Sequence, residues 1–564
     1  MNEINQNNTQ AMAQPNTQIG YSPMFDAEAQ KIFASQEETE ETKKMKAGFR
    51  FFGPATFIYA MFYALCMYRN ASGVTFPFFV GGSLFYMCVC LGKLTVTLKR
   101  GSAFYWISML LLSISTFYTD DYKLILFNKT GIFFLTMIFL LSQFYDTKKW
   151  GFGKFLGSMF ISVFAAFGEI CRPFSDAVNC LKKEENKKNK KTVYVIIGLV
   201  IAIPLFVIML LLLSSADIVF KQVTDGFMNL LNPLDIFGIG FSVCVMFFAA
   251  YCILSYLCKK RLNEEVKDKR TGEPVVAIII TGVLSVLYLF FSMIQIVYLF
   301  VGNMELPENY TYSMYAREGF FQLLAVSIMN LIIVLVVLSR FRNSGILKGI
   351  LTVMSGCTFI MIASSALRMV MYIRFYYLTF LRVFVLWALL LLALLFVGVV
   401  ITIYKDKFPL FRYSMVVVTL LYLGLTFSRP ESFISKINIA YTEEYAKESM
   451  NQTAPKSDFF LAEHFYQDYE YLSQMSADAS ETIVPYLEKI GYDLEGFYAN
   501  MKEEGIPAGY RITKLLGVGR YSRYNKEEFG YYYLRDLEIS YEDFGIRTYN
   551  ISRAAAFSQV KQYR

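Results

Sequence analysis

Long apolar stretches alternate with short polar ones along most of this chain. A helix needs about 20 residues to cross the roughly 30 Å hydrocarbon layer of a bilayer. Eleven stretches come near this length, of which the first, third and last are the shortest. They lie near 51–68, 74–92, 103–119, 123–145, 193–213, 235–258, 275–300, 319–339, 346–372, 380–404 and 410–428. The pattern predicts an all-α membrane protein with about eleven transmembrane helices.

Lysine and arginine are unevenly divided among the connecting segments. If the N-terminus is cytoplasmic, the basic segments all fall inside: 93–102, 146–192, 259–274, 340–345 and 405–409. The segments on the other side are poor in lysine and mostly acidic: 69–73, 120–122, 214–234, 301–318 and 373–379. Acid pairs in them, such as Asp120 and Asp121, are expected to be exposed loop charges. Basic loops stay on the cytoplasmic side of a membrane. The charges therefore predict a cytoplasmic N-terminus, and an odd number of spans places the C-terminal part outside.

One further apolar segment, 155–170, has basic residues on both flanks. Positive charge at both ends opposes crossing, because one end would have to lie on the outer side. We predict a helix that lies at the inner interface and packs on the bundle or on lipid. If it crossed instead, the predicted position of the C-terminal part would be reversed.

The chain thus divides into three predicted regions. Residues 1–50 form a polar, partly disordered cytoplasmic tail, and 51–428 form the membrane domain, with a basic cytoplasmic loop and interfacial helix at 146–192. Residues 429–564 form an α-rich soluble domain outside the membrane, with 16 basic and 21 acidic residues and hence a net charge of −5. In that domain, 458–475 and 480–491 are predicted helices, with Asp478 and Ser480 as candidate N-caps. Its many tyrosines suggest a surface that packs on the membrane or on a partner.

Composition supports the membrane assignment and argues against several kinds of chemistry. The 564 residues are 55% hydrophobic and 18% charged, and the net charge of +8 resides in loops rather than in one basic domain, so no nucleic-acid partner is expected. The nine cysteines include no CxxC pair, and His464 is the only histidine. A zinc site of the usual kind and a phosphate-binding GxxxxGK[ST] loop are both missing from the sequence. We expect no cofactor, no metal and no catalytic residue, and an enzyme acting on a lipid-linked substrate is the least favoured class.

Polar residues gather where the predicted spans seven to ten approach the outer side. Helical spacing places Gln295 on one face of span seven with Tyr288 and Ser292, and Arg368 on one face of span nine with Ser364 and Tyr372. Arginine near hydrocarbon is costly and needs a partner, and three of these arginines oppose the positive-inside bias. The candidate ligand-binding residues are Asp217, Gln295, Arg317, Glu318, Gln322, Arg368, Tyr372, Arg374 and Arg382.

Two interpretations of these arginines remain open. In the first, they pair internally with acids such as Glu318 or Asp217 and hold the helices together. In the second, they bind an anionic ligand, because a guanidinium binds carboxylate and phosphate through two parallel hydrogen bonds. Such a ligand would be a lipid headgroup or a small molecule.

Several segments together resemble a known family. They are Leu213–Asp217, Tyr315–Leu323 (YAREGFFQL), Tyr471–Ser473 with Asp478-Ala479, and Tyr549–Arg553. The chain resembles, from about residue 50 to its end, a family of bacterial integral membrane proteins catalogued as a domain of unknown function. The resemblance implies a multi-pass bacterial membrane protein and supplies no activity and no site residues.

Two functions follow as hypotheses. The first is a cell-envelope protein that binds or transports an anionic or amphipathic molecule at an outer polar pocket. The second is a structural or signalling accessory whose outer C-terminal domain contacts another envelope protein. A membrane cavity beside the arginines favours the first, whereas arginines fully paired inside the bundle favour the second.

Overall fold

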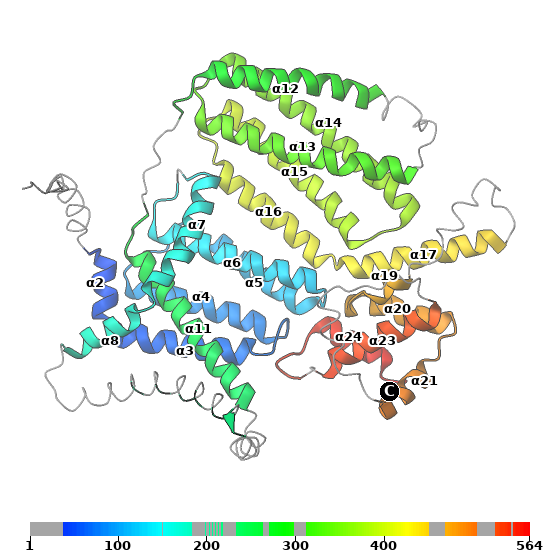
Figure 1. Ribbon diagram of the computed structural model, residues 1–564, viewed down its shortest axis with the longest axis horizontal. Helices are drawn as coiled ribbons and strands as arrows, with labels where there is room; N and C mark the ends of the chain where they lie inside the picture. Colours follow the sequence, from blue (N-terminus) through cyan, green and yellow to red (C-terminus); the bar gives the residue numbers. More distant parts are fainter. Residues whose placement is uncertain are drawn as a thin grey trace, which may run out of the picture.

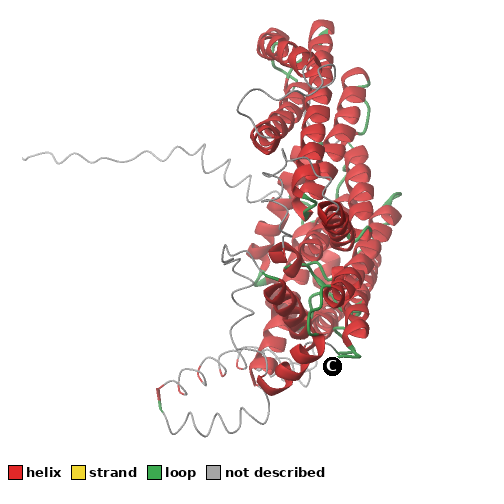
Figure 2. Cartoon of the chain, turned by 90° about the vertical axis from the view of Figure 1, so that its right-hand side faces the viewer, coloured by secondary structure: helices red, strands yellow, loops and turns green. Residues whose placement is uncertain are grey.

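The computed structural model describes residues 38–148, 150–182, 233–262, 270–297, 312–450, 469–504, 525–542 and 545–564, together with single positions between 198 and 217. The described chain is 82% helix without strands (Figure 2). Ten helices within these ranges are long and apolar enough to cross a membrane. The predicted all-α membrane class is therefore supported.

The first helical bundle contains α3, α4, α5, α6 and α11. Helix α3 packs on α4 and α11, α4 packs on α5, and α5 packs on α6. Their buried side chains, among them Leu91, Leu112 and Phe139, belong to one apolar cluster. The bounds are Phe49–Met67 (α3), Thr75–Lys93 (α4), Ser102–Tyr118 (α5), Tyr122–Phe144 (α6) and Pro233–Cys258 (α11), and the short helix α2 (Glu40–Ala47) precedes α3.

The second bundle contains α12, α13, α14 and α15, with α14 in contact with the other three. Helix α16 packs on α15 and also on α5, so it connects the two bundles (Figure 1). The bounds are Pro274–Gln295 (α12), Tyr312–Arg340 (α13), Gly345–Tyr376 (α14), Phe380–Tyr404 (α15) and Leu410–Phe427 (α16).

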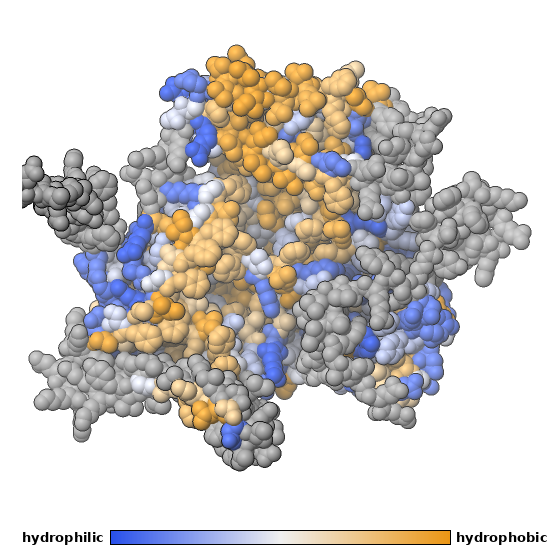
Figure 3. Space-filling view, in the orientation of Figure 1, coloured by the Kyte–Doolittle hydropathy of each residue, from blue (hydrophilic) through white to orange (hydrophobic). Residues whose placement is uncertain are grey.

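The outward faces of these helices are apolar. Helix α12, for example, exposes Val283, Val286 and Phe290 at about two-thirds of their surface or more. Figure 3 shows a broad hydrophobic area over the helices and hydrophilic residues toward their ends. Apolar patches of this extent mark surfaces that lipid or another protein covers, which fits a multi-pass membrane protein.

Nine of the eleven predicted stretches coincide with candidate spans among the described residues. The stretch 103–119 is the helix α5, which has 17 residues and is shorter than the other spans. The stretch 193–213 lies outside the continuously described residues. The tenth candidate span is Phe152–Glu169, the segment for which the sequence predicted an interfacial helix.

This segment forms α7 (Phe152–Ala166) and a 3₁₀ turn, Phe167–Glu169. At its start, the ring of Phe155 stacks on Phe411, with centroids 3.9 Å apart, where α16 begins. At its end, Glu169 forms an ion pair with Lys259, just after α11 ends. In Figure 1, α7 runs across the direction of its neighbours. Although α7 is long enough to count as a span, this arrangement agrees with a helix that lies along one end of the bundle.

Segments that the charge pattern assigned to one side do meet in space. Lys99 N–H donates to Gln143 at 3.0 Å, and Asn343 donates to Asp406 at 3.0 Å. Helix α8 (Arg172–Lys182) packs on α2 and α3 at this same end of the molecule. At the opposite ends of the helices, the described loops 69–73, 120–122 and 373–379 contact the C-terminal part of the chain instead. The predicted grouping of loops is thus seen, while the direction of the protein in the membrane is not determined by it.

The C-terminal helices share a core with the membrane helices. Leu124 of α6 and Phe380 of α15 are buried in the same apolar cluster as Ile483, Phe529 and Tyr533. Tyr533 is therefore a core residue and not part of a tyrosine surface. The bounds are Pro430–Met450 (α17), Tyr469–Ser473 (α19), Ala477–Ala479 (η4), Ser480–Lys489 (α20), Leu494–Glu504 (α21), Lys526–Glu542 (α23) and Ile551–Val560 (α24).

Candidate functional site

Three predicted polar positions of the second bundle come together in the arginine cluster (Gln295, Ser364 and Arg368). Arg368 is only 7% exposed and donates from Nη2 to Oε1 of Gln295 at 3.3 Å. Ser364 Oγ donates to the same oxygen at 2.6 Å. The one-face stripes predicted on spans seven and nine therefore face each other across α12 and α14.

The arginine cluster depends on a glycine of α13. A Cβ added to Gly319 would lie 1.8 Å from Nη1 of Arg368, far inside van der Waals contact. The guanidinium therefore lies directly against the backbone of α13. Glycine is required here because no other residue leaves room for this approach.

Two further arginines of the predicted pocket, Arg382 and Arg374, lie outside the arginine cluster. Arg382 donates to the carbonyl oxygens of Tyr376 and Tyr377, where α14 ends, and its guanidinium lies 4.4 Å from the ring centroid of Tyr372. A cation that binds the last carbonyls of a helix stabilises that helix end. Arg374 and Gln322 are exposed and do not join the arginine cluster.

Three further predicted residues are Arg317, Glu318 and Asp217. Arg317 and Glu318 lie on α13, but the side chains at 312–318 fall outside the described part of the chain. Asp217 is exposed, and its amide donates to the Leu213 carbonyl at 3.2 Å. His464 lies outside the described residues.

A second polar site, which the sequence did not predict, lies between the membrane helices and the C-terminal helices. We call it the carboxylate cluster (Asp120, Asp121, Glu431 and Asp478). Asp478 comes from η4 and is 0% exposed. Its carboxylate accepts a hydrogen bond from the Thr119 hydroxyl and another, at 2.9 Å, from the Asp120 amide. A C-terminal side chain thus binds the loop that joins α5 to α6.

Glu431 at the start of α17 provides the second contact of this kind. It is 3% exposed. Its Oε1 pairs with Nζ of Lys123 at 3.2 Å, and its Oε2 accepts from the Ser476 amide at 2.7 Å. The Lys123 ammonium also lies 4.7 Å from the ring centroid of Phe380, so α6, α15 and α17 converge on one cation.

Asp121 is the least satisfied member of the cluster. It is 1% exposed, and its Oδ1 accepts from the Lys123 amide at 2.9 Å as the N-cap of α6. Its Oδ2 is buried and has no hydrogen-bond partner among the described residues. Burial, together with the nearby charges of Glu431 and Asp478, raises the pKa of Asp121 to about 7, against the opposing effect of Lys123. Asp121 can therefore hold a proton near neutral pH.

Two arginines from the C-terminal part of the chain form ion pairs with two acids of the carboxylate cluster. Arg553 pairs through Nε with Asp120 at 2.6 Å. Arg429 approaches Asp478 at 3.9 Å and donates to its backbone carbonyl at 3.3 Å. Among the described residues, no three acidic, cysteine or histidine side chains are arranged to hold a metal. Within the described structure, Lys123 pairs with Glu431, Arg429 with Asp478 and Arg553 with Asp120.

A turn of the C-terminal region is inserted between two loops of the first bundle. Asn550 Nδ2 donates to the carbonyls of Ser72 at 3.2 Å and Thr119 at 3.0 Å. Val74 N–H donates to the Tyr549 carbonyl at 2.8 Å. A Cβ on Gly73 would lie 2.2 Å from the Arg547 carbonyl oxygen, so only glycine permits this close contact.

Two sequence interpretations are wrong at this site. Asp120 and Asp121 were expected to be exposed loop charges, yet Asp121 is buried and Asp120 nearly so. Asp478 was expected to cap α20, whereas that helix starts after Ala479 and has no side-chain cap. Sequence spacing gives no sign that positions about 360 residues apart are neighbours. The only signal was that Asp478-Ala479 and Tyr549–Arg553 lie in segments that carry the family resemblance.

Comparison with curated proteins gives no match, and comparison with solved structures gives none either. The family described as "Domain of unknown function (DUF4153)" matches residues 106–486. This match covers more than half of the chain, including the arginine cluster and all four residues of the carboxylate cluster. The chain belongs to the DUF4153 family of domains of unknown function.

Proposed function

We propose that this protein is a structural or signalling accessory of the bacterial cell membrane. In this proposal, its C-terminal helices lie outside the membrane and bind another envelope protein. The N-terminus is cytoplasmic, as the distribution of lysine and arginine predicts. The observation that carries the proposal is the complete burial of Asp478 against the α5–α6 loop.

The carboxylate cluster supports coupling between the two parts. A buried, hydrogen-bonded carboxylate is strongly destabilised when it loses its partners. Any partner that shifts η4 or α17 would therefore also disturb Thr119 and Lys123 at the ends of α5 and α6. A binding event on the C-terminal helices can in this way change the packing of the membrane helices.

The internal contacts of the arginines also favour this function over transport. Arg382 binds backbone carbonyls at the end of α14, and Arg368 is buried against Gln295 and Gly319. Arginines that stabilise helix packing are expected of an accessory protein.

A second candidate function is binding or transport of an anionic or amphipathic molecule beside Arg368. The observation that favours it is the nearly buried guanidinium of Arg368 in the C-terminal half of α14. The partners in this proposal would be lipid or a small anionic molecule, and Arg317, Glu318, Gln322, Tyr372 and Arg374 would line its approach.

The position of the C-terminal helices can be tested directly. Ser558 of α24 is exposed, and Ser558→Cys adds a thiol of nearly the same size. We expect a membrane-impermeant maleimide to label this variant in intact cells well above the unmodified protein. Labelling only after the cells are opened would contradict the proposal.

The partner is tested by photo-crosslinking in cells. A crosslinking amino acid at the exposed Glu495 should join this protein to one envelope protein. The same crosslink should weaken in Asp478→Ala, provided that the protein level is unchanged. The exposed Leu98, at the opposite end of the bundle, is the control position. Equal crosslinking from Leu98, or none from Glu495, would contradict an accessory role.

A further inference from the structure

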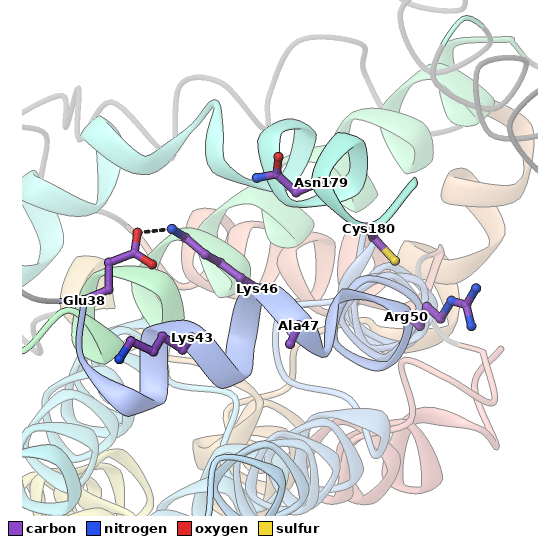
Figure 4. Close-up of a pocket in the computed structure, with 7 residues that line it drawn as sticks. All are labelled: Glu38, Lys43, Lys46, Ala47, Arg50, Asn179 and Cys180. Carbon is purple, nitrogen blue, oxygen red and sulfur yellow. Dashed lines mark hydrogen bonds and ion pairs between the residues drawn. The ribbon is translucent and has the colours of Figure 1, made fainter. Parts of the chain in front are cut away.

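A hollow of about 630 Å³ lies where α2 and the start of α3 face α8. It is at the end of the molecule opposite to the C-terminal helices (Figure 1). Lys43, Lys46 and Arg50 line one wall, and Asn179 and Cys180 of α8 line the other (Figure 4). Among the described residues that line the hollow, Glu38 alone is acidic, and it forms an ion pair with Lys46, so the charge of this described lining is net positive.

The basic side chains remain accessible from this hollow. The side chain of Lys43 is 56% exposed although it contacts Glu40 at 3.1 Å, and an exposed pair of this kind contributes little energy. Arg50 is also exposed. The guanidinium of Arg50 suits a phosphate group, because arginine offers two parallel donors, and the ammonium of Lys43 adds a compact positive charge farther along the same wall (Figure 4).

An apolar track begins at the same place. Arg50 is the second residue of α3, and exposed apolar residues follow it at i+4, i+7, i+8, i+11 and i+15. These spacings place them on one face of the helix. They are Pro54, Phe57, Ile58, Met61 and Leu65, and the last four are each at least half exposed.

We infer that the hollow binds the headgroup of an anionic glycerophospholipid, whose acyl chains lie along the exposed face of α3. The phosphate would contact Arg50, where the apolar track begins. The rest of the headgroup would extend along the hollow toward Lys43 and Asn179 (Figure 4). A soluble anion would use the charges but not the track, whereas a phospholipid uses both. The inference does not depend on the role proposed for the C-terminal helices.

The test uses the full-length protein purified in detergent and native mass spectrometry. Phosphatidylglycerol and phosphatidylcholine with the same acyl chains are added separately, and the bound fraction is measured. We expect phosphatidylglycerol to bind about tenfold more tightly, and K43A/R50A to lose about that factor. The control K405A/K407A, which removes two exposed lysines after α15, should bind as the unmodified protein does.

Two further measurements keep the result unambiguous. K43R/R50K preserves both charges and should retain phosphatidylglycerol binding. If K43R/R50K loses binding as K43A/R50A does, the site does not depend on charge. Inorganic phosphate should not displace phosphatidylglycerol at millimolar concentration. Displacement by phosphate, or equal lipid binding by K43A/R50A and K405A/K407A, would overturn the inference.

Discussion

The arginine cluster of the second bundle and the carboxylate cluster beneath the C-terminal helices both remove charge from water, but they do so differently. Arg368 donates to the amide oxygen of Gln295 and lies against the backbone at Gly319. The carboxylate cluster sets four acids against Lys123, Arg429 and Arg553. The first arrangement joins neighbouring helices within one bundle. The second joins parts of the chain that are hundreds of residues apart, which makes it the better candidate for transmitting a signal.

The largest effect is expected from Asp478→Ala. This change leaves Thr119 and the Asp120 amide without their acceptor, and leaves Arg429 with the exposed Glu481, at 3.8 Å, in place of a buried carboxylate. Loss of one partner from a buried charged group costs about 3–5 kcal/mol. We expect a marked fall in the thermal unfolding temperature in detergent and faster proteolysis of residues 430–564. Glu495→Ala removes an exposed acid from the same region and should change neither; a similar effect of both variants would refute the special role of Asp478.

Gly319→Ala tests the arginine cluster. The added methyl group collides with the Arg368 guanidinium, and overpacking of this kind costs about 1–3 kcal/mol. The clash should largely disappear when Arg368→Ala is added, giving a coupling energy of about 0.5–3 kcal/mol in a double-mutant cycle. Unfolding temperatures of the two single variants and the double variant provide the measurement. Additive effects would show that Arg368 does not lie against α13.

Asp121→Asn tests whether a proton on the carboxylate cluster makes the stability of the protein depend on pH. The folded pKa of Asp121 is about 7 and its ordinary value is 3.8, so the native protein holds a proton that the unfolded chain releases. The stability that this proton contributes is full below about pH 4 and is lost as the pH rises to about 7. Asparagine removes this dependence. We expect the variant to gain stability relative to the unmodified protein between about pH 5 and pH 8, measured as unfolding temperature.

The groups that face Asp121 are Glu431 of α17, Asp478 of η4 and Lys123 of α6. A matched control is Asp493→Asn, an exposed acid on the loop before α21. A difference between Asp121→Asn and the unmodified protein that does not change with pH would show that Asp121 stays ionised.

The smallest effect is expected from Arg382→Gln. The variant loses a cation at the last carbonyls of α14, a contribution of about 0.3–1 kcal/mol. Hydrogen exchange at Tyr376–Thr379 should increase while the rest of the bundle is unchanged. If lipid or ligand binding were lost instead, Arg382 would belong to a binding site and the transport hypothesis would gain support.

The lengths of the apolar stretches and the positions of lysine and arginine predict much of the helical architecture from the sequence alone. Nine candidate spans and the grouping of the described loops at two ends follow from local composition, because hydrocarbon admits only long apolar helices and leaves charge at their ends. The same reasoning placed Gln295 on one face of span seven, and Ser364 and Arg368 on one face of span nine, since helical periodicity fixes which residues share a face. The packing of α12 on α14 brings these two faces together.

Tertiary structure alone decided which charges are buried. Asp121 and Asp478 look like an exposed loop acid and a helix cap in sequence, and only the packing of the C-terminal helices on the α5–α6 loop makes them neighbours. The same holds for Gly319 and Gly73, whose need for glycine arises from a guanidinium and a backbone carbonyl that approach from elsewhere in the chain. Periodicity acts over a few residues, whereas burial and ionisation depend on neighbours that sequence distance does not reveal.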